Sequence, residues 1–351
     1  MARENKTFVL AERPKTEIIP GQTFKLEKGP APTDDQLKDG EILVEALYLS
    51  LDPAMRGWLN DTRSYVPPVQ IGETMRGFTI SRVLASKSPK VKTGDIVTAP
   101  IGWTEVAIAN EKSIEPVLIP KGGQITDALG VLGLTGMTAW TGLDRIGNLK
   151  SGETVLVSGA AGATGSVVGQ IAKLRGCRVV GIAGSDDKCA WLTKELGFDA
   201  ALNYKSASFK NDLEAATPDF VDVYWDNVGG EILEQALNRA KLRARFIMCG
   251  SISGYNQPGK QSTGIRNLFH VVSQRIRMEG FIVFDFAEDY PRARKEIASW
   301  LEQGKLKRKE TIVKGGLEKA DTAIRDLFEG KNTGKLLVEV KSPDEVRGAK
   351  L

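Results

Sequence analysis

The chain has 351 residues, of which 41% are hydrophobic and 26% charged, a composition typical of a globular protein and long enough for two domains. Its net charge of +4 balances 48 basic against 44 acidic residues, a bias too weak to indicate nucleic acid or an anionic membrane as a partner. No apolar run approaches the roughly 20 residues of a membrane span, and residues 1–6 lack the apolar core of a signal peptide.

Residues 1 to about 125 predict a β-rich first domain. Short alternating segments at 41–49, 78–84 and 95–99 are separated by Gly and Pro. From about residue 126 to 304 the pattern changes to alternating strands and helices, which predicts a doubly wound parallel sheet, the α/β class. The expected strands are 154–160, 178–183, 199–202, 220–225, 244–249 and 279–284. The expected helices in this part include 164–175 and 187–196, each followed by a glycine that stops it.

The last part of the chain predicts a return to the first domain. A helix is expected at about 291–303 and another at about 318–329, followed by a strand at 335–340. We expect residues 305–351 to complete the N-terminal β-rich unit.

The most informative motif is a glycine turn between an apolar strand and a helix. Gly159, Gly162 and Gly165 recur at intervals of three, directly after the run 155–157. Such a turn brings backbone N–H groups and a helix N-terminus up to a pyrophosphate. Glycines alone can mark tight packing, but the strand before and the helix after them favour a dinucleotide site.

The end of the second strand indicates which dinucleotide is bound. An NAD site usually has an acidic residue there, whereas this strand ends at Gly184-Ser185, which leaves space for a 2′-phosphate. Asp186 and Asp187 follow and argue the other way, although both suit a helix N-cap. Lys188 and Lys205 are candidate phosphate ligands. We therefore expect NADP(H).

The scarce histidine and cysteine content argues against a metal centre. His270 is the single histidine and lies in an apolar segment, where a packed helix residue is the simpler interpretation. Cys177, Cys189 and Cys249 are far apart, so we expect neither zinc nor a disulfide framework. A reducing compartment, the cytoplasm, is the expected location.

Eight ordered blocks give the chain a resemblance to a known family over nearly its full length. It resembles the zinc-independent medium-chain dehydrogenase/reductases, most closely the branch of prostaglandin/leukotriene reductases, alkenal double-bond reductases and curcumin reductases. The blocks are 49–56 (LSLDPAMR), 136–139 (GMTA), 160–169 (AAGATGSVVG), 184–188 (GSDDK), 203–205 (NYK), 226–230 (DNVGG), 249–256 (CGSISGYN) and 332–335 (NTGK).

The resemblance implies a GroES-like β-rich domain over 1–125, completed by about 305–351, and a Rossmann NADP-binding domain over 126–304. It also implies a homodimer, for which 281–284 is the candidate edge strand. The expected cofactor contacts are Gly162, Ala163, Thr164, Gly165, Ser185, Lys188, Tyr204, Asn227, Cys249, Gly250, Ser251, Ile252, Tyr255, Phe281, Ile282, Val283 and Asn332. Tyr255 matches the active-site tyrosine of the family, and Arg56, Tyr65 and Tyr255 are the expected substrate contacts.

The implied reaction is the NADPH-dependent reduction of the carbon–carbon double bond of an α,β-unsaturated ketone or aldehyde. Because no metal is expected, a hydrogen-bond donor would meet the charge that develops on the carbonyl oxygen, and the candidates are Tyr255, the ribose hydroxyl of the cofactor, or both. Tyr255 or water would then protonate the α-carbon. The chain departs from the family at Ala54, where tyrosine is common, and at Thr135, where some members carry proline, so the substrate range stays open. A quinone reductase, a zinc-free alcohol dehydrogenase and a non-catalytic NADPH-binding protein are the alternatives.

Overall fold

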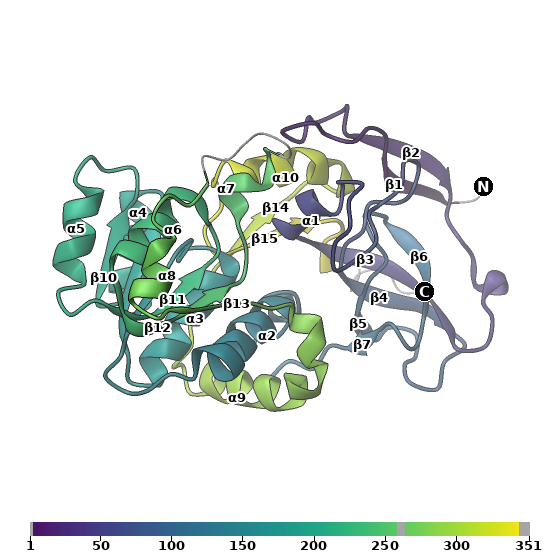
Figure 1. Ribbon diagram of the computed structural model, residues 1–351. Helices are drawn as coiled ribbons and strands as arrows, with labels where there is room; N and C mark the ends of the chain where they lie inside the picture. Colours follow the sequence, from purple (N-terminus) through teal and green to yellow (C-terminus); the bar gives the residue numbers. More distant parts are fainter. Residues whose placement is uncertain (1–2, 258–263, 344–351) are drawn as a thin grey trace.

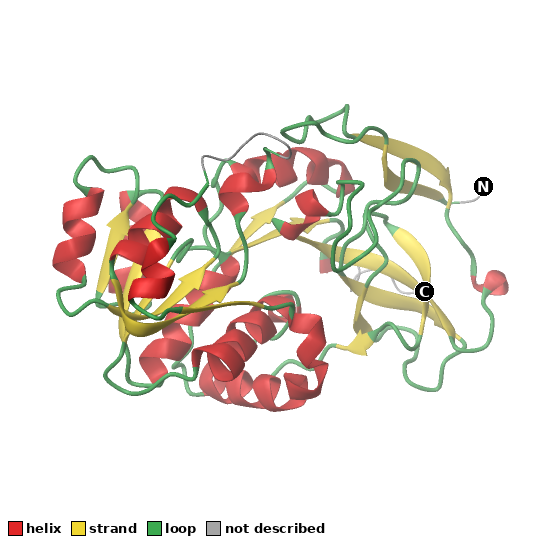
Figure 2. Ribbon diagram, in the orientation of Figure 1, coloured by secondary structure: helices red, strands yellow, loops and turns green. Residues whose placement is uncertain are grey.

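The computed structural model describes residues 3–257 and 264–343. Two units lie side by side, one built on a parallel sheet surrounded by helices and the other mostly of strands and loops (Figures 1 and 2). No helix among the described residues is both long and apolar enough to cross a membrane.

The parallel-sheet unit, which follows the β-rich unit in the chain, contains six parallel strands within the described residues. Their order is β10-β9-β8-β11-β12-β13, and each neighbouring pair is parallel. The order reverses on the two sides of β8, and ligands of such sheets bind beyond the carboxyl ends of the strands at this switch point. The strands are β8 (Thr154–Val157), β9 (Arg178–Ala183), β10 (Ala200–Asn203), β11 (Val221–Asp226), β12 (Ala240–Met248) and β13 (Arg277–Gly280).

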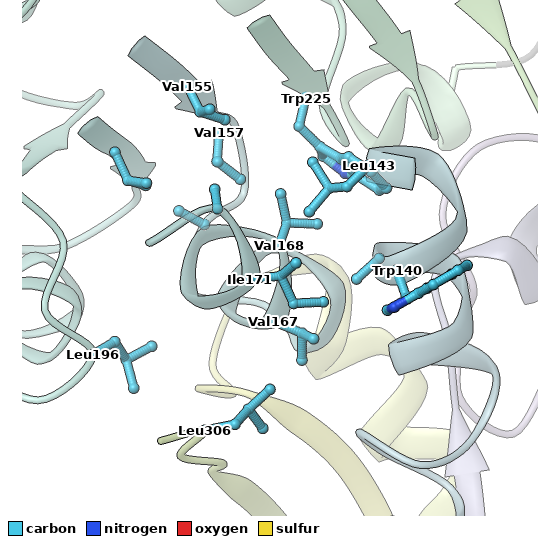
Figure 3. Packing of buried hydrophobic residues seen from close by; sticks show 14 of the residues in the cluster. Trp140, Leu143, Val155, Val157, Val167, Val168, Ile171, Leu196, Trp225 and Leu306 are labelled. Atoms are coloured by element: carbon cyan, nitrogen blue, oxygen red, sulfur yellow. The ribbon is translucent and has the colours of Figure 1, made fainter. Parts of the chain in front are cut away.

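Helices cover both faces of this sheet, as the doubly wound fold requires. On one face α2, α3 and α9 pack in a single buried cluster that includes Trp140, Val168 and Ile297 (Figure 3). On the other face α5 and α6 pack in a second cluster around Leu213 and Leu233. The helices of this unit are α2 (Leu134–Thr141), α3 (Ala163–Leu174), α4 (Asp186–Lys194), α5 (Phe209–Ala216), α6 (Gly230–Asn238), α7 (Ile252–Tyr255), α8 (Phe269–Ser273) and α9 (Tyr290–Glu302), with a π-helical turn at Gly142–Gly147.

The second unit contains a sheet of mixed direction in the order β14-β15-β3-β4-β5-β7, with β6 paired to β3 and a separate β1-β2 hairpin. Its strands are β1 (Glu4–Leu10), β2 (Phe24–Pro30), β3 (Glu41–Leu51), β4 (Thr79–Ser86), β5 (Ile96–Ala99), β6 (Val106–Asn110), β7 (Glu115–Pro116), β14 (Glu310–Val313) and β15 (Lys335–Glu339). Helices α1 (Ala54–Gly57) and α10 (Ala320–Phe328) lie beside it, and short 3₁₀ turns occupy Asp34–Gln36, Ile125–Ala128 and Leu317–Lys319. A further 3₁₀ helix, Val283–Asp289, belongs to the parallel-sheet unit.

The C-terminal strands return to the N-terminal unit, since β15 pairs antiparallel with β3 and carries β14 at its outer side. The expected fold class, a doubly wound parallel sheet with a β-rich second unit, is confirmed. The domain boundaries near residues 125 and 305 stay our proposal.

One predicted strand is wrong. Residues 279–284 were expected to form it, but β13 ends at Gly280 and a 3₁₀ helix begins at Val283. Phe281 turns inward there and meets Trp225 edge to face, with the ring centroids 5.8 Å apart. The apolar residues 281–284 therefore predicted a strand although they pack beside the sheet. The edge strand of the sheet is β13.

Candidate active site

The glycine turn lies at the carboxyl end of β8, and α3 begins directly after it. Gly159 has φ +58°, a conformation that suits glycine, and a Cβ on Gly162 would lie 3.2 Å from the carbonyl oxygen of Gly159. Gly162 is the N-cap of α3, and Ala163 and Thr164 stand partly exposed in its first turn. The N–H groups of a first helical turn have no acceptor within their own helix, so this end of α3 suits a pyrophosphate.

Two lysines and a tyrosine, from α4 and from the turn after β10, lie beside the end of β9, where a 2′-phosphate would be bound. A Cβ on Gly184 would lie 3.1 Å from Cε1 of Tyr204, so the tyrosine ring covers the strand end closely. Lys205 lies over that ring with Nζ 5.8 Å from the centroid. Partial burial lowers the pKa of Lys188 and the charge of Lys205 lowers it further, with no carboxylate among the causes. This pair of cations therefore favours an anion.

The two aspartates that argued against a 2′-phosphate have structural roles. Ser185 is the N-cap of α4, and its hydroxyl accepts from the Lys188 N–H at 3.4 Å. Asp186 and Asp187 occupy the first two positions of α4, where negative charge is favourable. Asp186 also accepts from Asn203 Nδ2 at 2.8 Å. The expectation that the aspartates are N-caps is wrong by one residue, because serine takes that position.

A buried carboxylate, which the sequence reasoning missed, organises the opposite side of the glycine turn. Asp226 ends β11 and is fully buried, and its Oδ1 accepts from Ser158 Oγ at 3.1 Å and Tyr224 Oη at 2.9 Å. The same oxygen accepts from the N–H groups of Val228 at 2.9 Å and Gly229 at 2.8 Å. An acidic residue directly after the expected strand 220–225 was the signal that could have revealed it.

The loop from Cys249 to Tyr255 is attached to this aspartate and its neighbours. The N–H groups of Cys249 and Gly250 both donate to the carbonyl of Asp226, at 2.9 and 3.0 Å. Asn227 receives the Ile252 N–H on its carbonyl, at 3.2 Å, and its side-chain amide donates to Ser158 O at 2.7 Å. The structure thus brings together the expected residues Asn227, Cys249, Gly250 and Ile252, and Ser251 lies exposed between the last two.

Tyr255 ends α7, the short helix that lies in Figure 1 on the side of the parallel-sheet unit toward α10. Its phenol oxygen accepts the Ser251 N–H at 3.1 Å. Burial raises the pKa of this phenol, so it stays protonated at neutral pH. Because the hydrogen bond uses the oxygen as acceptor, the O–H proton is available for another molecule.

Tyr65 of the β-rich unit lies near Tyr255 of the parallel-sheet unit. It lies in the loop after α1, is 46% exposed, and accepts the Trp58 Nε1–H at 2.9 Å. Tyr65 is close enough to contribute to the raised pKa of Tyr255, and Cys249 likewise contributes to that of Tyr65. Burial raises the pKa of the Cys249 thiol to about 12, so it is neutral and no nucleophile.

Arg56 is not a substrate contact in this structure, which corrects the sequence expectation. Its side chain is fully buried. The guanidinium donates to the carbonyls of Thr16 and Pro14 and to Asn60 Oδ1, at 2.7 to 3.0 Å. Because these donors are already used, Arg56 connects the loop before β2 with α1 inside the β-rich unit and is not free to bind a substrate.

A loop before β15 joins the β-rich unit to the glycine turn. The Gly334 N–H donates to Ala161 O at 2.8 Å, and Gly162 and Gly334 form a parallel bridge. Asn332 is buried, and its Nδ2 donates to Gly334 O at 2.9 Å, so it shapes this loop. Phe281, Ile282 and Val283 are partly buried beyond the end of β13.

Among residues 3–257 and 264–343, no group of three or more His, Cys, Asp and Glu side chains is arranged to hold a metal ion. His270 lies in α8 and is half-buried, and Cys177, Cys189 and Cys249 are free.

The two units and the site at their junction define the class of a dinucleotide-dependent oxidoreductase. Two family models match the chain: the N-terminal domain of oxidoreductase over residues 6–117 and zinc-binding dehydrogenase over 163–299. The chain belongs to the zinc-independent branch of the medium-chain dehydrogenase/reductases, as its motifs predicted.

Similar proteins cover the whole chain or most of it. NADPH-dependent curcumin reductase of Escherichia coli is 38% identical over 97% of this chain and 99% of its own length. The NADP⁺-dependent 2-alkenal reductase of Nicotiana tabacum is 41% identical over 86% of this chain and 87% of its own. The crystal structure of CurA in complex with NADPH, from Vibrio vulnificus, superposes with a TM-score of 0.88 at 38% identity, covering 96% of this chain and 100% of that one.

Proposed function

We propose that this chain reduces the carbon–carbon double bond of α,β-unsaturated ketones and aldehydes with NADPH. The observation that carries the proposal is the protonated phenol of Tyr255, near Tyr65, at the junction beside the cofactor loop. The names of its relatives, curcumin reductase and 2-alkenal reductase, support the same substrate class.

The residues present fit NADPH. The first turn of α3 would hold the pyrophosphate, through Gly162, Ala163, Thr164 and Gly165. The pair of lysines beside Tyr204, with Ser185 at the cap of α4, would hold the 2′-phosphate. Asn227, Phe281–Val283, Asn332 and the loop 249–255 would line the nicotinamide half. NADPH then supplies a hydride for the β-carbon of the substrate.

Tyr255 has a geometry that suits stabilisation of the substrate's carbonyl oxygen during hydride transfer. As the double bond is reduced, negative charge develops on the carbonyl oxygen of the substrate, and a preorganised donor is needed to stabilise it. The Ser251 N–H fixes the phenol oxygen at 3.1 Å, so its O–H can be directed at the substrate. Tyr65 supplies a second phenol from the opposite unit, and the α-carbon receives its proton from a phenol or from water.

The decisive experiment compares substrate classes with purified protein. We expect loss of NADPH absorbance with a simple enone, and much slower loss with a quinone. A secondary alcohol with NADP⁺ should give no comparable rate. Faster reduction of the quinone would favour the quinone reductase, and faster oxidation of the alcohol the alcohol dehydrogenase. Binding of NADPH without turnover of any of these would identify a non-catalytic NADPH-binding protein.

We also propose a homodimer in a reducing, cytoplasmic setting. The outer edge of β13 has no partner strand among the described residues, and α8 with its N-cap Leu268 exposes apolar side chains, those of Leu268, Phe269 and Val272. The free state of the three cysteines is compatible with a reducing compartment. Light scattering of the wild type and of Phe269→Asp tests the dimer, which the charge at a side chain 75% exposed should weaken.

A further inference from the structure

The side-chain amide of Asn227 is held in one orientation by two groups with fixed hydrogen-bonding roles. The indole N–H of Trp225 can only donate, and it donates to Asn227 Oδ1 at 3.0 Å. The main-chain carbonyl of Ser158 can only accept, and it accepts from Asn227 Nδ2 at 2.7 Å. A reversed amide would set donor against donor and acceptor against acceptor. The two contacts therefore determine which atom of the amide faces Trp225 and which faces Ser158.

The indole of Trp225 is itself fixed by its surroundings. The side chain is fully buried at the end of β11. A Cβ on Gly142, the first residue of the π-helical turn, would lie 2.5 Å from two carbons of the indole, so the turn closes directly on the ring. Phe281 meets the ring from another side, with the centroids 5.8 Å apart. Because the ring is enclosed in this way, the direction of its N–H is set by the packing.

One amide N–H of Asn227 has no acceptor among the described residues. The residue is partly exposed and lies over the glycine turn, since a Cβ on Gly159 would be 3.3 Å from Asn227 Cβ. Its main chain is also held, because its N–H donates to Ser158 Oγ at 2.9 Å and its carbonyl accepts the Ile252 N–H at 3.2 Å. A held, partly exposed donor at the switch point of the sheet suits an acceptor on a bound molecule.

We propose that Trp225 is a positioning residue for the cofactor, because its indole N–H holds Asn227 so that the free amide N–H serves the carboxamide oxygen of the nicotinamide ring. A carbonyl oxygen accepts and cannot donate, so it matches this N–H. With the amide reversed, an oxygen would replace the N–H and repel the carbonyl. This inference rests on the proposed function, which assigns Asn227 and the loop 249–255 to the nicotinamide half.

The test measures binding of the cofactor and does not depend on turnover. Isothermal titration calorimetry compares NADPH with its thionicotinamide analogue, in which a weakly accepting sulfur replaces the carboxamide oxygen. For the wild type we expect the analogue to bind about fivefold more weakly, as for the loss of one neutral hydrogen bond. Trp225→Phe keeps an aromatic ring without the N–H. It should bind NADPH more weakly and bring the ratio of the two dissociation constants close to one.

Two further variants separate orientation of the amide from packing of the core. Trp140 is the matched control, because it is another buried indole of the same cluster and donates to Glu296 instead. Trp140→Phe should keep the wild-type ratio. Asn227→Ala removes the donor and leaves both buried indoles in place, so its ratio should also fall close to one. This variant tests the assignment even if Trp225→Phe does not fold.

Three results would overturn the assignment. Equal binding of NADPH and the analogue by the wild type, or a wild-type ratio in Asn227→Ala, would mean that this amide does not serve the carboxamide. A wild-type ratio in Trp225→Phe would leave the indole a packing role alone. A fall of the ratio in Trp140→Phe to the value of Trp225→Phe would indicate a general loosening of the core. Failure of the proposed function is a separate result, in which the expected ratios are found and no enone is reduced.

Discussion

Lys188 of the parallel-sheet unit donates through Nζ to the carbonyl oxygen of Gly330 in the other unit, at 2.6 Å. The lysine expected to hold the 2′-phosphate thus already contacts the loop that carries Asn332 and continues to Gly334. Gly334 in turn binds the glycine turn through Ala161. The proposed recognition of the adenosine end of the cofactor and the contact between the two units therefore depend on the same side chain.

Replacing Lys188 by alanine should weaken the binding of NADPH much more than the binding of NADH. The 2′-phosphate loses a charged donor, which we expect to raise KM for NADPH about tenfold to a hundredfold. NADH lacks this phosphate and should change little. Steady-state kinetics with both cofactors measures the difference, and Lys194→Ala is the matched control on the same helix. An equal rise in KM for NADH and NADPH would contradict the phosphate assignment.

Replacing Tyr255 by phenylalanine should lower kcat for an enone about a hundredfold, as for the loss of one preorganised donor. The ring and its packing remain, so KM for NADPH should stay near the wild-type value. Tyr48→Phe is the control, because Tyr48 lies within β3 in the other unit. If kcat of Tyr255→Phe matched that of the wild type, another group or water would supply the proton, and Tyr65→Phe would be the next variant to measure.

Much of the fold could be predicted because local signals were strong. The apolar strands, the glycine turn and the glycine stops after the helices fixed the α/β alternation, and the resemblance supplied the β-rich unit. The prediction of a strand at 279–284 was wrong because residues typical of strands, such as Phe281 and Val283, are equally suited to packing beside a sheet. Sequence spacing cannot distinguish the two until the tertiary partner, here Trp225, is known.

The site was predicted less evenly. Motifs placed Lys188, Tyr204 and Tyr255 where the structure brings them to the two ends of the proposed cofactor site. Arg56 lies in an equally recognisable motif, residues 49–56. However, the sequence alone could not show that its side chain is buried and that its guanidinium has three acceptors within the protein. The structural role of Asp226 could not be predicted, because its four donors come from Ser158 just after β8, from β11 and from the loop after β11.

Replacing Asp226 by alanine should both reduce the stability of the protein and disturb the proposed binding site for the nicotinamide half of NADPH. Four donors, among them the buried Ser158 and Tyr224 hydroxyls, would lose their acceptor, and we expect the free energy of unfolding to fall by at least about 2 kcal/mol. KM for NADPH should rise as well. Asp226→Asn is the matched variant, because Oδ2 has no partner and the amide keeps an acceptor oxygen. Urea unfolding measures the effect, and equal losses in both variants would sink the hydrogen-bond explanation.

Replacing Glu45 by glutamine should destabilise the β-rich unit in a way that depends on pH. The Glu45 side chain is 1% exposed and accepts from Arg3, from Arg82 at 3.1 Å and from Lys341 at 2.9 Å. Burial alone raises the pKa of this carboxyl, but the hydrogen bonds from Lys341 and Arg3 outweigh it, and the pKa in the folded protein is lowered.

The direction of the pH effect follows from this lowered pKa. The contribution of Glu45 to stability is fully present above its unfolded value of about 4.5 and is lost as the pH falls through the lower folded pKa. At pH 7 we expect Glu45→Gln to reduce the free energy of unfolding by about 2 kcal/mol, since three cations lose their counter-ion. Urea unfolding at pH 7 and at successively lower pH measures both proteins. The difference between them should shrink below pH 4.5, and a constant difference would mean that packing, and not the charge of Glu45, accounts for the loss.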